Sequence, residues 1–196
     1  MNVVASQYHP GEAPRYDAVS LDFAATPQGK YVEVKLASPD CLQLSEVEIF
    51  GYSIRTPPLN LARQAGVQAT QSSTCWNGHP WRAVDGNTNG NWGSNTITHT
   101  CGGGDQWWML DLGAVKGVEH VVVYNRWDEC CRNRLHDSEV QILDQNGAVI
   151  ASQPIINGIR MNDLYFASGT VGRYVRFQKN ANSDFTLAEV QVWGWG

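Results

Sequence analysis

Short runs in which β-branched or aromatic residues alternate with other residues recur along the second half of this 196-residue chain. The clearest runs are 121–125, 140–144, 174–177 and 190–193, and turn-forming residues bound them. No stretch has the sustained 3.6-residue period that an amphipathic helix requires. Residues 61–100 are rich in Ser, Thr, Asn and Gly, so we expect mainly loops there. Short strands joined by long polar loops predict an all-β sandwich with its loops gathered at one end.

An internal repeat sets the expected domain organisation. Residues 29–51 align without gaps on residues 172–194, with glycine, tyrosine and valine residues in register. We therefore predict a partial copy of the domain at 1–52, a proline-containing linker at 53–60 and a complete domain at 61–196. Two strands cannot close a sandwich alone. The partial copy is thus expected to pack on the complete domain, to pair with a second copy of the chain as a homo-oligomer, or to stay loose.

Composition and motifs argue against several classes of function. A net charge of −5 opposes nucleic-acid binding, because phosphates need a basic surface. No apolar run approaches the ~18 residues of a membrane-spanning helix, so no membrane insertion is expected. The N-terminus lacks the pattern of a signal peptide. No GxSxG or HExxH motif and no paired-carboxylate pattern appears, so we predict that the chain is not an enzyme.

The densest group of polar and reactive side chains lies in the run 125–135, directly after a strongly predicted strand. The run contains three arginines, two acidic residues and the adjacent pair Cys130 and Cys131. Arginine offers several donors in a fixed fork, which suits the hydroxyl groups of a sugar. Taken alone, an Arg126–Asp128 pair is also typical of a surface ion pair, and His99 is also compatible with a core histidine.

The spacing of these residues resembles the signature of the F-type lectins (fucolectins), which is a His, 26 residues, Arg-x-Asp, four residues, and Arg or Lys. His99 and Arg126 are separated by 26 residues, and Asp128 completes the Arg-x-Asp triplet. The resemblance spans about 60–194. Further segments similar to the family are 69–73, 83–87, 107–113, 172–175 and 187–190.

The second basic position departs from the family spacing. Five residues, not four, separate Asp128 from Arg134, which we interpret as an insertion of Glu129. Arg132 and Arg134 are therefore alternatives for this position. The run Cys130-Cys131-x-x-Arg134-Leu135 matches the family pattern and favours Arg134.

The resemblance implies a discoidin-like jelly-roll β-sandwich that recognises terminal α-L-fucose on glycans without catalysis. Arginine side chains would bind the sugar hydroxyls, and a Cys130–Cys131 disulfide would offer a flat face to the less polar side of fucose. The residues expected in this site are His99, Arg126, Asp128, Cys130, Cys131 and Arg134, with Trp92, Trp76 and His79 from neighbouring loops. The alternatives are a discoidin-like adhesion module that binds membrane or protein, and an accessory domain that binds another sugar such as galactose.

A second expected site is a structural calcium ion. Oxygen donors two residues apart on the glycine-containing loop 85–89 suit Ca²⁺, although an ordinary Asp-Gly turn would look the same. The resemblance implies the carboxylates of Asp85 and Glu189 and the carbonyl groups of Arg82, Asn87 and Ala188, with Thr96 nearby. Such an ion would hold the long loop in place and would not bind the sugar.

The chain has five cysteines. Apart from the adjacent pair, Cys75 and Cys101 lie on the two predicted long loops, and we expect them to form a disulfide. Cys41 aligns with Asp184 in the repeat. Disulfides imply an oxidising compartment, so the expected location is extracellular.

Overall fold

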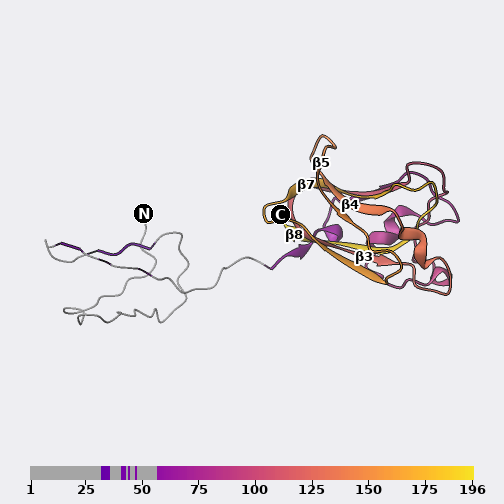
Figure 1. Ribbon diagram of the computed structural model, residues 1–196, viewed down its shortest axis with the longest axis horizontal. Coiled ribbons are helices and arrows are strands. Elements are labelled where there is room, and N and C mark those ends of the chain that lie inside the picture. The colour runs from indigo at the N-terminus through magenta and orange to yellow at the C-terminus, as the bar shows by residue number, and fades with distance from the viewer. Residues whose placement is uncertain (1–31, 36–40, 43, 45–46, 48–56) are drawn as a thin grey trace. The chain divides into compact units, whose positions relative to one another are not determined.

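The structure is a computed structural model, and its chain divides into two units, Met1–Arg55 and Thr56–Gly196 (Figure 1). It describes residues 32–35, 41–42, 44, 47 and 57–196. The predicted partial copy at 1–52 lies almost wholly outside the described residues and stays a prediction. The boundary between the two units falls within the segment 53–60 that we assigned to the linker.

Eight strands and four short 3₁₀-helices form the second unit, and the described residues contain no α-helix. The strands are β1 (Leu59–Asn60), β2 (Gln68–Gln71), β3 (Trp107–Asn125), β4 (Ser138–Leu143), β5 (Val149–Pro154), β6 (Met161–Tyr165), β7 (Val171–Lys179) and β8 (Leu187–Trp195). The 3₁₀-helices are η1 (Leu61–Arg63), η2 (Pro80–Val84), η3 (Trp92–Ser94) and η4 (Arg132–Leu135). The prediction of an all-β fold is confirmed, and the four alternating runs fall in β3, β4, β7 and β8, except that Asp144 follows β4.

The long strand β3 belongs to both layers of the sandwich. Its first part pairs with β2 and β7, and its last part pairs with β6 and β8. The register with β7 shifts between Asp111 and Lys116, where the strand passes from one layer to the other. The order β1-β8-β3-β7-β4-β5 is therefore continuous, although it covers two packed faces (Figure 1). In Figure 1, β3 and β8 lie below β4 and β7.

The core lies between these faces and follows from the alternation within each strand. Trp108 and Leu110 of β3 are fully buried, as are Val121 and Val123 farther along the same strand. Phe177 of β7 is also buried. A buried apolar side chain of this size stabilises the fold by roughly 1.5–3 kcal/mol relative to an exposed one.

The pairing register brings the three functional connections to one end of the sandwich. Trp107 pairs with Gln178, and Asn125 pairs with Leu187, so the two ends of β3 lie beside the end of β7 and the start of β8. The connections 72–106, 126–137 and 180–186 all leave from these strand ends. The predicted gathering of long loops at one end is confirmed. Among the described residues, no helix is long and apolar enough to cross a membrane.

Candidate functional site

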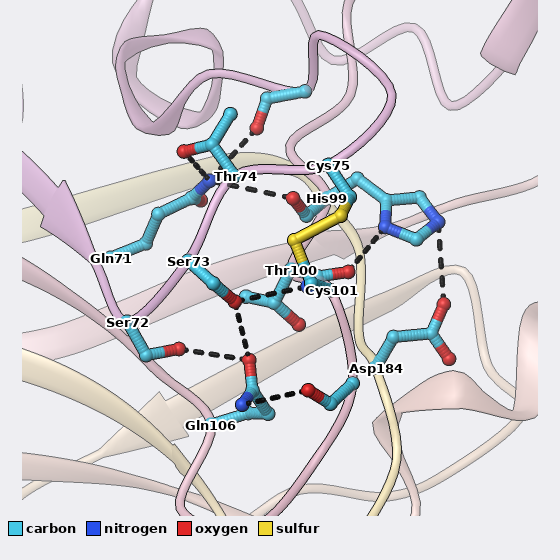
Figure 2. Close-up of a disulfide and its surroundings, with 12 residues drawn as sticks. Gln71, Ser72, Ser73, Thr74, Cys75, His99, Thr100, Cys101, Gln106 and Asp184 are labelled. Carbon is cyan, nitrogen blue, oxygen red and sulfur yellow. Dashed lines mark hydrogen bonds and ion pairs between the residues drawn. A yellow bond between two sulfur atoms is a disulfide. The ribbon is translucent and has the colours of Figure 1, made fainter.

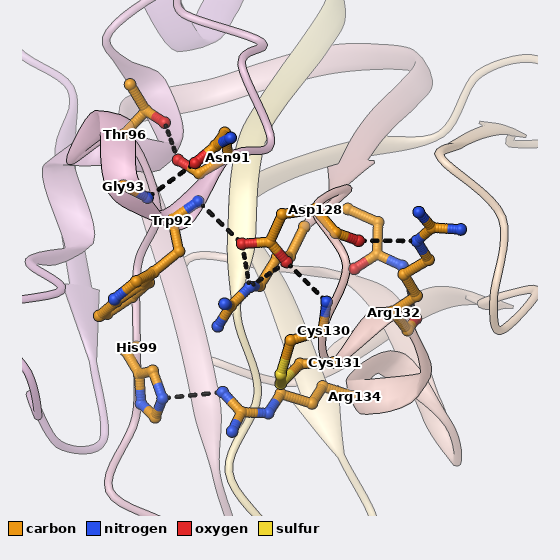
Figure 3. Close-up of polar contacts among 12 residues, drawn as sticks. Asn91, Trp92, Gly93, Thr96, His99, Asp128, Cys130, Cys131, Arg132 and Arg134 are labelled. Carbon is orange, nitrogen blue, oxygen red and sulfur yellow. Dashed lines mark hydrogen bonds and ion pairs between the residues drawn. A yellow bond between two sulfur atoms is a disulfide. The ribbon is translucent and has the colours of Figure 1, made fainter.

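Asp128 organises the loop that follows β3. Its carboxylate accepts two hydrogen bonds from Arg126 Nε, at 2.9 and 3.0 Å. It also accepts the backbone N–H groups of Trp92 and Cys130, each at 3.1 Å (Figure 3). Burial by itself raises the pKa of Asp128, but these hydrogen bonds and the charge of Arg126 outweigh it and lower the pKa to about 2. Asp128 is therefore an anion at any physiological pH and fixes the orientation of Arg126.

Arg126 is 8% exposed, and only its Nε is used by Asp128. The guanidinium carbon lies 5.1 Å from the centre of the Trp92 ring. The Trp92 ring in turn meets His99 edge to face, with a centroid distance of 5.4 Å. The predicted residues Trp92, His99 and Arg126 are thus brought together, and the two terminal nitrogens of Arg126 remain as donors.

His99 is buried and is held in one tautomer. Its Nδ1 lies 2.5 Å from the carbonyl oxygen of Thr100, which can only accept. Its Nε2 lies 2.8 Å from Nη1 of Arg134, which can only donate (Figure 3). The proton is therefore on Nδ1, and the imidazole is neutral. Burial lowers the pKa of His99, and the charges of Arg134 and Arg126 lower it further, against the Thr100 carbonyl and the charge of Asp184, which raise it.

The structure separates the two candidate arginines. Arg134 points toward His99, and its Nη2 also lies 3.2 Å from Asp184 Oδ2. Arg132 points away from His99 (Figure 3). Its Nε donates to the carbonyl oxygen of Asp128 at 2.9 Å, and its guanidinium stacks 4.4 Å from the centre of the Trp127 ring. Arg134 therefore accompanies His99 and Arg126, in spite of the inserted Glu129.

The Cys130–Cys131 disulfide lies at the start of η4, close to Arg134 (Figure 3). Cys131 adopts a φ of 67°, in the left-handed region, and precedes the first residue of η4. This turn reverses the chain so that Arg134 returns toward the strand end that carries Arg126. The disulfide therefore lies beside Arg134 (Figure 3).

Three site-supporting residues were missed by the sequence analysis. Asp184 forms an ion pair with Arg134, and its Oδ2 lies 3.3 Å from His99 Nε2 (Figure 2). Lys179 is fully buried, and its Nζ donates to the carbonyl oxygens of Arg134 and His136, at 2.9 and 2.8 Å. Asn125 donates from Nδ2 to the Arg132 carbonyl at 2.8 Å. The alternation of β7 could have revealed Lys179, because it continues the inward-facing series of the strand.

A second loop packs directly on His99. Its Cys75 is joined to Cys101 by the expected disulfide (Figure 2). The N–H of Cys75 donates to the His99 carbonyl at 3.0 Å, and the N–H of His99 donates to the Gly78 carbonyl at 2.9 Å. A Cβ at Gly78 would overlap the backbone of His99, so only glycine fits there.

Trp76 and His79 project from this second loop. The Trp76 side chain is 75% exposed. The Nε2 of His79 donates to Oδ1 of Asn77 at 2.7 Å, and the His79 ring is nearly parallel to that of Trp81, with a centroid distance of 6.4 Å. Neither side chain is in contact with Arg126 or Arg134 among the described residues. Their sugar-binding role stays a prediction.

Glu189, one of the residues expected to hold calcium, contacts the loop that carries Asp85. Glu189 is fully buried, and its Oε1 accepts the N–H of Gly86 at 3.1 Å, while Oε2 has no partner among the described residues. Burial, with the charge of Asp85, raises the pKa of Glu189 to about 8. Ala188 is the extra residue of a bulge between β8 and β3, so its peptide lies outside the regular ladder.

Two further expected ligands, Thr96 and Arg82, form hydrogen bonds with other groups. Thr96 donates from Oγ1 to the Asn89 carbonyl at 2.5 Å. The Arg82 side chain is buried and donates to the Ile97 carbonyl at 3.2 Å and to Asn95 at 2.6 Å, which leaves only its own carbonyl as a ligand. The described residues contain no group of three His, Cys, Asp or Glu side chains suited to a metal. A buried carboxylate oxygen without a partner among the described residues, close to the charge of Asp85, nevertheless fits a hard cation.

A regular series of side-chain turns links this region to the arginine cluster. Each member accepts the backbone N–H two residues ahead, at 2.8–3.0 Å, and the acceptors are Asp85, Asn87, Asn89 and Asn91. The series ends at η3, which carries Trp92. The carbonyl of Gly90 accepts the N–H of Trp127 at 2.7 Å, and a Cβ at Gly90 would collide with that backbone. The loop therefore packs closely against the segment 125–127 at the end of β3.

Comparisons with known proteins agree with this arrangement. Residues 82–177 match the family of NedA-like, galactose-binding domains. A fucolectin of Anguilla anguilla is 29% identical over 116 residues, which are 56% of this chain and 73% of that protein.

Two solved structures are closer in sequence. The lectin domain of Lectinolysin, complexed with Lewis B antigen, is 36% identical with a TM-score of 0.65, and the match covers 70% of this chain and 98% of that one. A Streptococcus pneumoniae fucose binding module, SpX-3, is 31% identical with a TM-score of 0.65, and the match covers 70% of this chain and 99% of that one. Together with the cluster of His99, Arg126 and Arg134, these likenesses show that the chain belongs to the F-type lectin (fucolectin) family.

Proposed function

We propose that this protein is a lectin that binds terminal α-L-fucose on glycans and catalyses no reaction. The observation that carries the proposal is the convergence of Arg126, Arg134 and His99 beside the Cys130–Cys131 disulfide. Hydrogen bonds from a charged donor are stronger than neutral ones, so two fixed arginines can hold an uncharged sugar through its hydroxyl groups.

Each side chain in the cluster has a distinct role in this proposal. The terminal nitrogens of Arg126 and Arg134 donate to sugar hydroxyls, and Asp128 and Asp184 hold the two guanidinium groups in position. His99 stays neutral, and its Nε2 accepts from Nη1 of Arg134 and so helps to hold that guanidinium group in position. The disulfide packs against the less polar face of fucose, and Trp92 packs against its methyl group.

A glycan array tests this proposal against its rivals. We expect hits to be confined to glycans that carry terminal fucose. Galactose-terminated hits without fucose would support the alternative that the matched family's name suggests. The exposed Trp76 and Trp81 are the feature that a membrane-binding adhesion module would use, so binding to liposomes with no response on the array would favour that alternative.

We further propose that the protein is extracellular, since its two disulfides need an oxidising compartment. The partial copy at 1–52 would provide a surface for self-association. Light scattering at several protein concentrations tests the second idea, and a monomer throughout would refute it.

Fucose binding is expected to weaken in acid through His99. Because its pKa is lowered, the folded protein keeps the neutral imidazole at pH values where an ordinary histidine is already protonated. Protonation would place Nε2–H against Arg134, with Arg126 also nearby and only Asp184 as a counter-charge. The Kd for methyl α-L-fucoside, measured by calorimetry, should be constant from pH 9 to pH 7 and should rise with a midpoint below 6.5.

The same linkage affects stability. Below pH 6.5 the unfolded state binds more protons at His99 than the folded state does, so the free energy of unfolding should fall as the pH falls.

For the binding experiment, His120→Gln is the control, because His120 lies in β3 beside Glu119 and Asp163 and its replacement should leave the pH profile of binding unchanged. An affinity that improves in acid would contradict this role of His99.

Calcium is the proposed structural ion, held by Glu189 and Asp85 with carbonyl groups of Arg82, Asn87 and Ala188. It would neutralise two neighbouring carboxylates and fix the loop that leads to Trp92. Adding EDTA should lower the Tm, and calcium at about 100 times its Kd should restore about 2.7 kcal/mol of stability. In Glu189→Gln, which keeps the shape and removes the charge, the Tm should not respond to either reagent. An equal Tm for the wild type in EDTA and in calcium would exclude the ion.

A further inference from the structure

Three aromatic rings gather on the outer face of the sheet formed by β6, β3 and β8. His120 of β3 pairs with Tyr165 of β6 on one side and with Trp193 of β8 on the other. The residues that alternate with them, such as Val121 and Val192, are buried in the core. Side chains of successive strand residues point to opposite faces, so the three rings project away from the core. We call these three residues the aromatic face.

The aromatic face is remote from the proposed fucose site. Along β3, His120 precedes Asn125 by five residues, which is roughly 16 Å of extended strand. Tyr165 is the last residue of β6 and Trp193 lies near the end of β8, whereas both strands begin beside the end of β3. A ligand on the aromatic face would therefore leave the fucose site free.

The rings hold one another in position. The His120 and Tyr165 rings are 4.7 Å apart between centroids with an interplanar angle of 24°, and the His120 and Trp193 rings are 6.0 Å apart at 14°. In the part of the chain that the structure describes, β6 pairs with β3 alone, and Tyr165 is 59% exposed. One side of the Tyr165 ring thus packs on the imidazole, and the other side is open. A ring fixed in this way loses little side-chain entropy when it binds a ligand.

Two carboxylates accompany the aromatic face. Oε2 of Glu119 lies 3.5 Å from His120 Nδ1, and Oδ1 of Asp163 lies 4.0 Å from His120 Nε2, so they lie on opposite sides of the imidazole. Their side chains are 36% and 38% exposed, and neither forms an ion pair with a lysine or an arginine among the described residues. Even a protonated imidazole would balance only one of the two charges. The surface therefore carries negative charge next to an open aromatic ring.

This combination selects a cation. The face of an aromatic ring attracts positive charge, and the two carboxylates do the same. A guanidinium group suits both, because it is planar, stacks on aromatic rings and donates paired hydrogen bonds to a carboxylate. The protein already contains such a stack, with the Arg132 guanidinium 4.4 Å from the centre of the Trp127 ring.

Self-association through this surface is disfavoured by the same charges. A second copy that met the aromatic face with its own aromatic face would bring four carboxylates together, and like charges repel. The occupant that complements the surface is therefore a basic group from a different molecule.

We propose that the aromatic face, with Glu119 and Asp163, docks an arginine side chain presented by a protein partner. The guanidinium lies on the open side of the Tyr165 ring and donates to the carboxylates, while His120 holds that ring in place. The proposal does not depend on the fucose site. It gives the domain two separate binding surfaces, one on the loops and one on the outer face of the sheet.

The test is a titration of the wild-type protein followed by NMR, because one exposed cation–π contact and exposed ion pairs are individually weak. The probes are the peptide acetyl-Gly-Arg-Gly-amide and the same peptide with citrulline, which has nearly the shape of arginine without its charge. The arginine peptide should shift the backbone amide signals of residues 119–120 and 163–165, and the citrulline peptide should leave them in place.

Variants of the surface should weaken this binding without changing the Tm. Glu119→Gln/Asp163→Asn keeps the shapes and removes both charges, and should raise the Kd for the arginine peptide about fivefold or more. Tyr165→Leu should raise it about threefold. The matched control Asp105→Asn/Asp144→Asn removes two negative charges from loops outside the aromatic face and should change the Kd less than twofold.

Four results would overturn the inference. If the arginine peptide shifts none of these signals, the surface does not dock a guanidinium group. Equal binding of the citrulline peptide would show that charge is not recognised. An equal loss in the control double variant would mean that the net charge of the protein attracts the peptide without a defined site. Signals that respond to methyl β-D-galactoside and not to the arginine peptide would make the surface a second sugar site.

Discussion

Replacing Arg126 by alanine should raise the Kd for methyl α-L-fucoside at least about 100-fold, equivalent to about 3 kcal/mol. The reason is that Arg126 supplies charged donors from a nearly buried position, and its removal leaves Asp128 facing the bound sugar without its cationic partner. Asp128 would keep its hydrogen bonds from the N–H groups of Trp92 and Cys130. The free energy of unfolding should therefore fall by less than about 2 kcal/mol. Calorimetry for binding and thermal melting for stability measure the two effects separately.

The chain offers a matched control for Arg126. Arg173 makes the same type of paired contact with an aspartate, donating to both oxygens of Asp111 at 3.0 and 2.9 Å. Arg173 and Asp111 lie on the β-strands β7 and β3, away from the Asp128 loop. Arg173→Ala should leave the Kd for fucoside unchanged. Retained binding in Arg126→Ala together with a large loss of stability would show that Arg126 is structural.

Removing the Cys75–Cys101 disulfide should cause the largest loss of stability. The bond closes a loop with a sequence separation of 26, and the loop-entropy relation gives about 3.5 kcal/mol for a loop of that length. For a domain of this size the double variant Cys75→Ser/Cys101→Ser should melt roughly 10 °C lower. The loop beside His99 would lose its tether, so fucoside affinity should also fall.

The adjacent disulfide gives the opposite pattern and serves as the comparison. Cys130 and Cys131 are neighbours in sequence, so their bond constrains almost nothing in the unfolded chain. Cys130→Ser/Cys131→Ser should therefore melt near the wild-type temperature while losing affinity for fucose, because the flat sulfur face is gone. Equal losses of Tm in the two double variants would contradict the loop-closure explanation.

The strands were predictable because the alternation of core-facing and outward-facing side chains can be read from neighbouring residues. In β3 and β8, alternate residues enter the core, and Val121, Val123, Val190 and Val192 are all buried. The loops in 61–100 were predictable for a similar reason, since asparagine and aspartate side chains accept backbone N–H groups in turns and glycine adopts the positive φ that many turns require. In the structure, this tendency produces the series of side-chain turns from Asp85 to Asn91.

The choice between Arg132 and Arg134 was not decided by spacing alone. An inserted residue can be absorbed anywhere in a loop, and the sequence does not say where. In the fold, the left-handed turn at Cys131 and the buried Lys179 ammonium fix η4. As a result, Arg134 contacts His99, whereas the Arg132 guanidinium stacks on the Trp127 ring.

By itself, then, the sequence determined the all-β fold and the family, and it predicted His99, Arg126 and Asp128 as site residues, because strand alternation and motif spacing are properties of neighbouring residues. Only the tertiary structure decided how the site is assembled. Asp184 lies 50 residues beyond Arg134 in the chain, and Lys179 supports its loop from another strand. Contacts of this kind depend on strand register and on the passage of β3 between layers, which bring distant segments to one end of the sandwich.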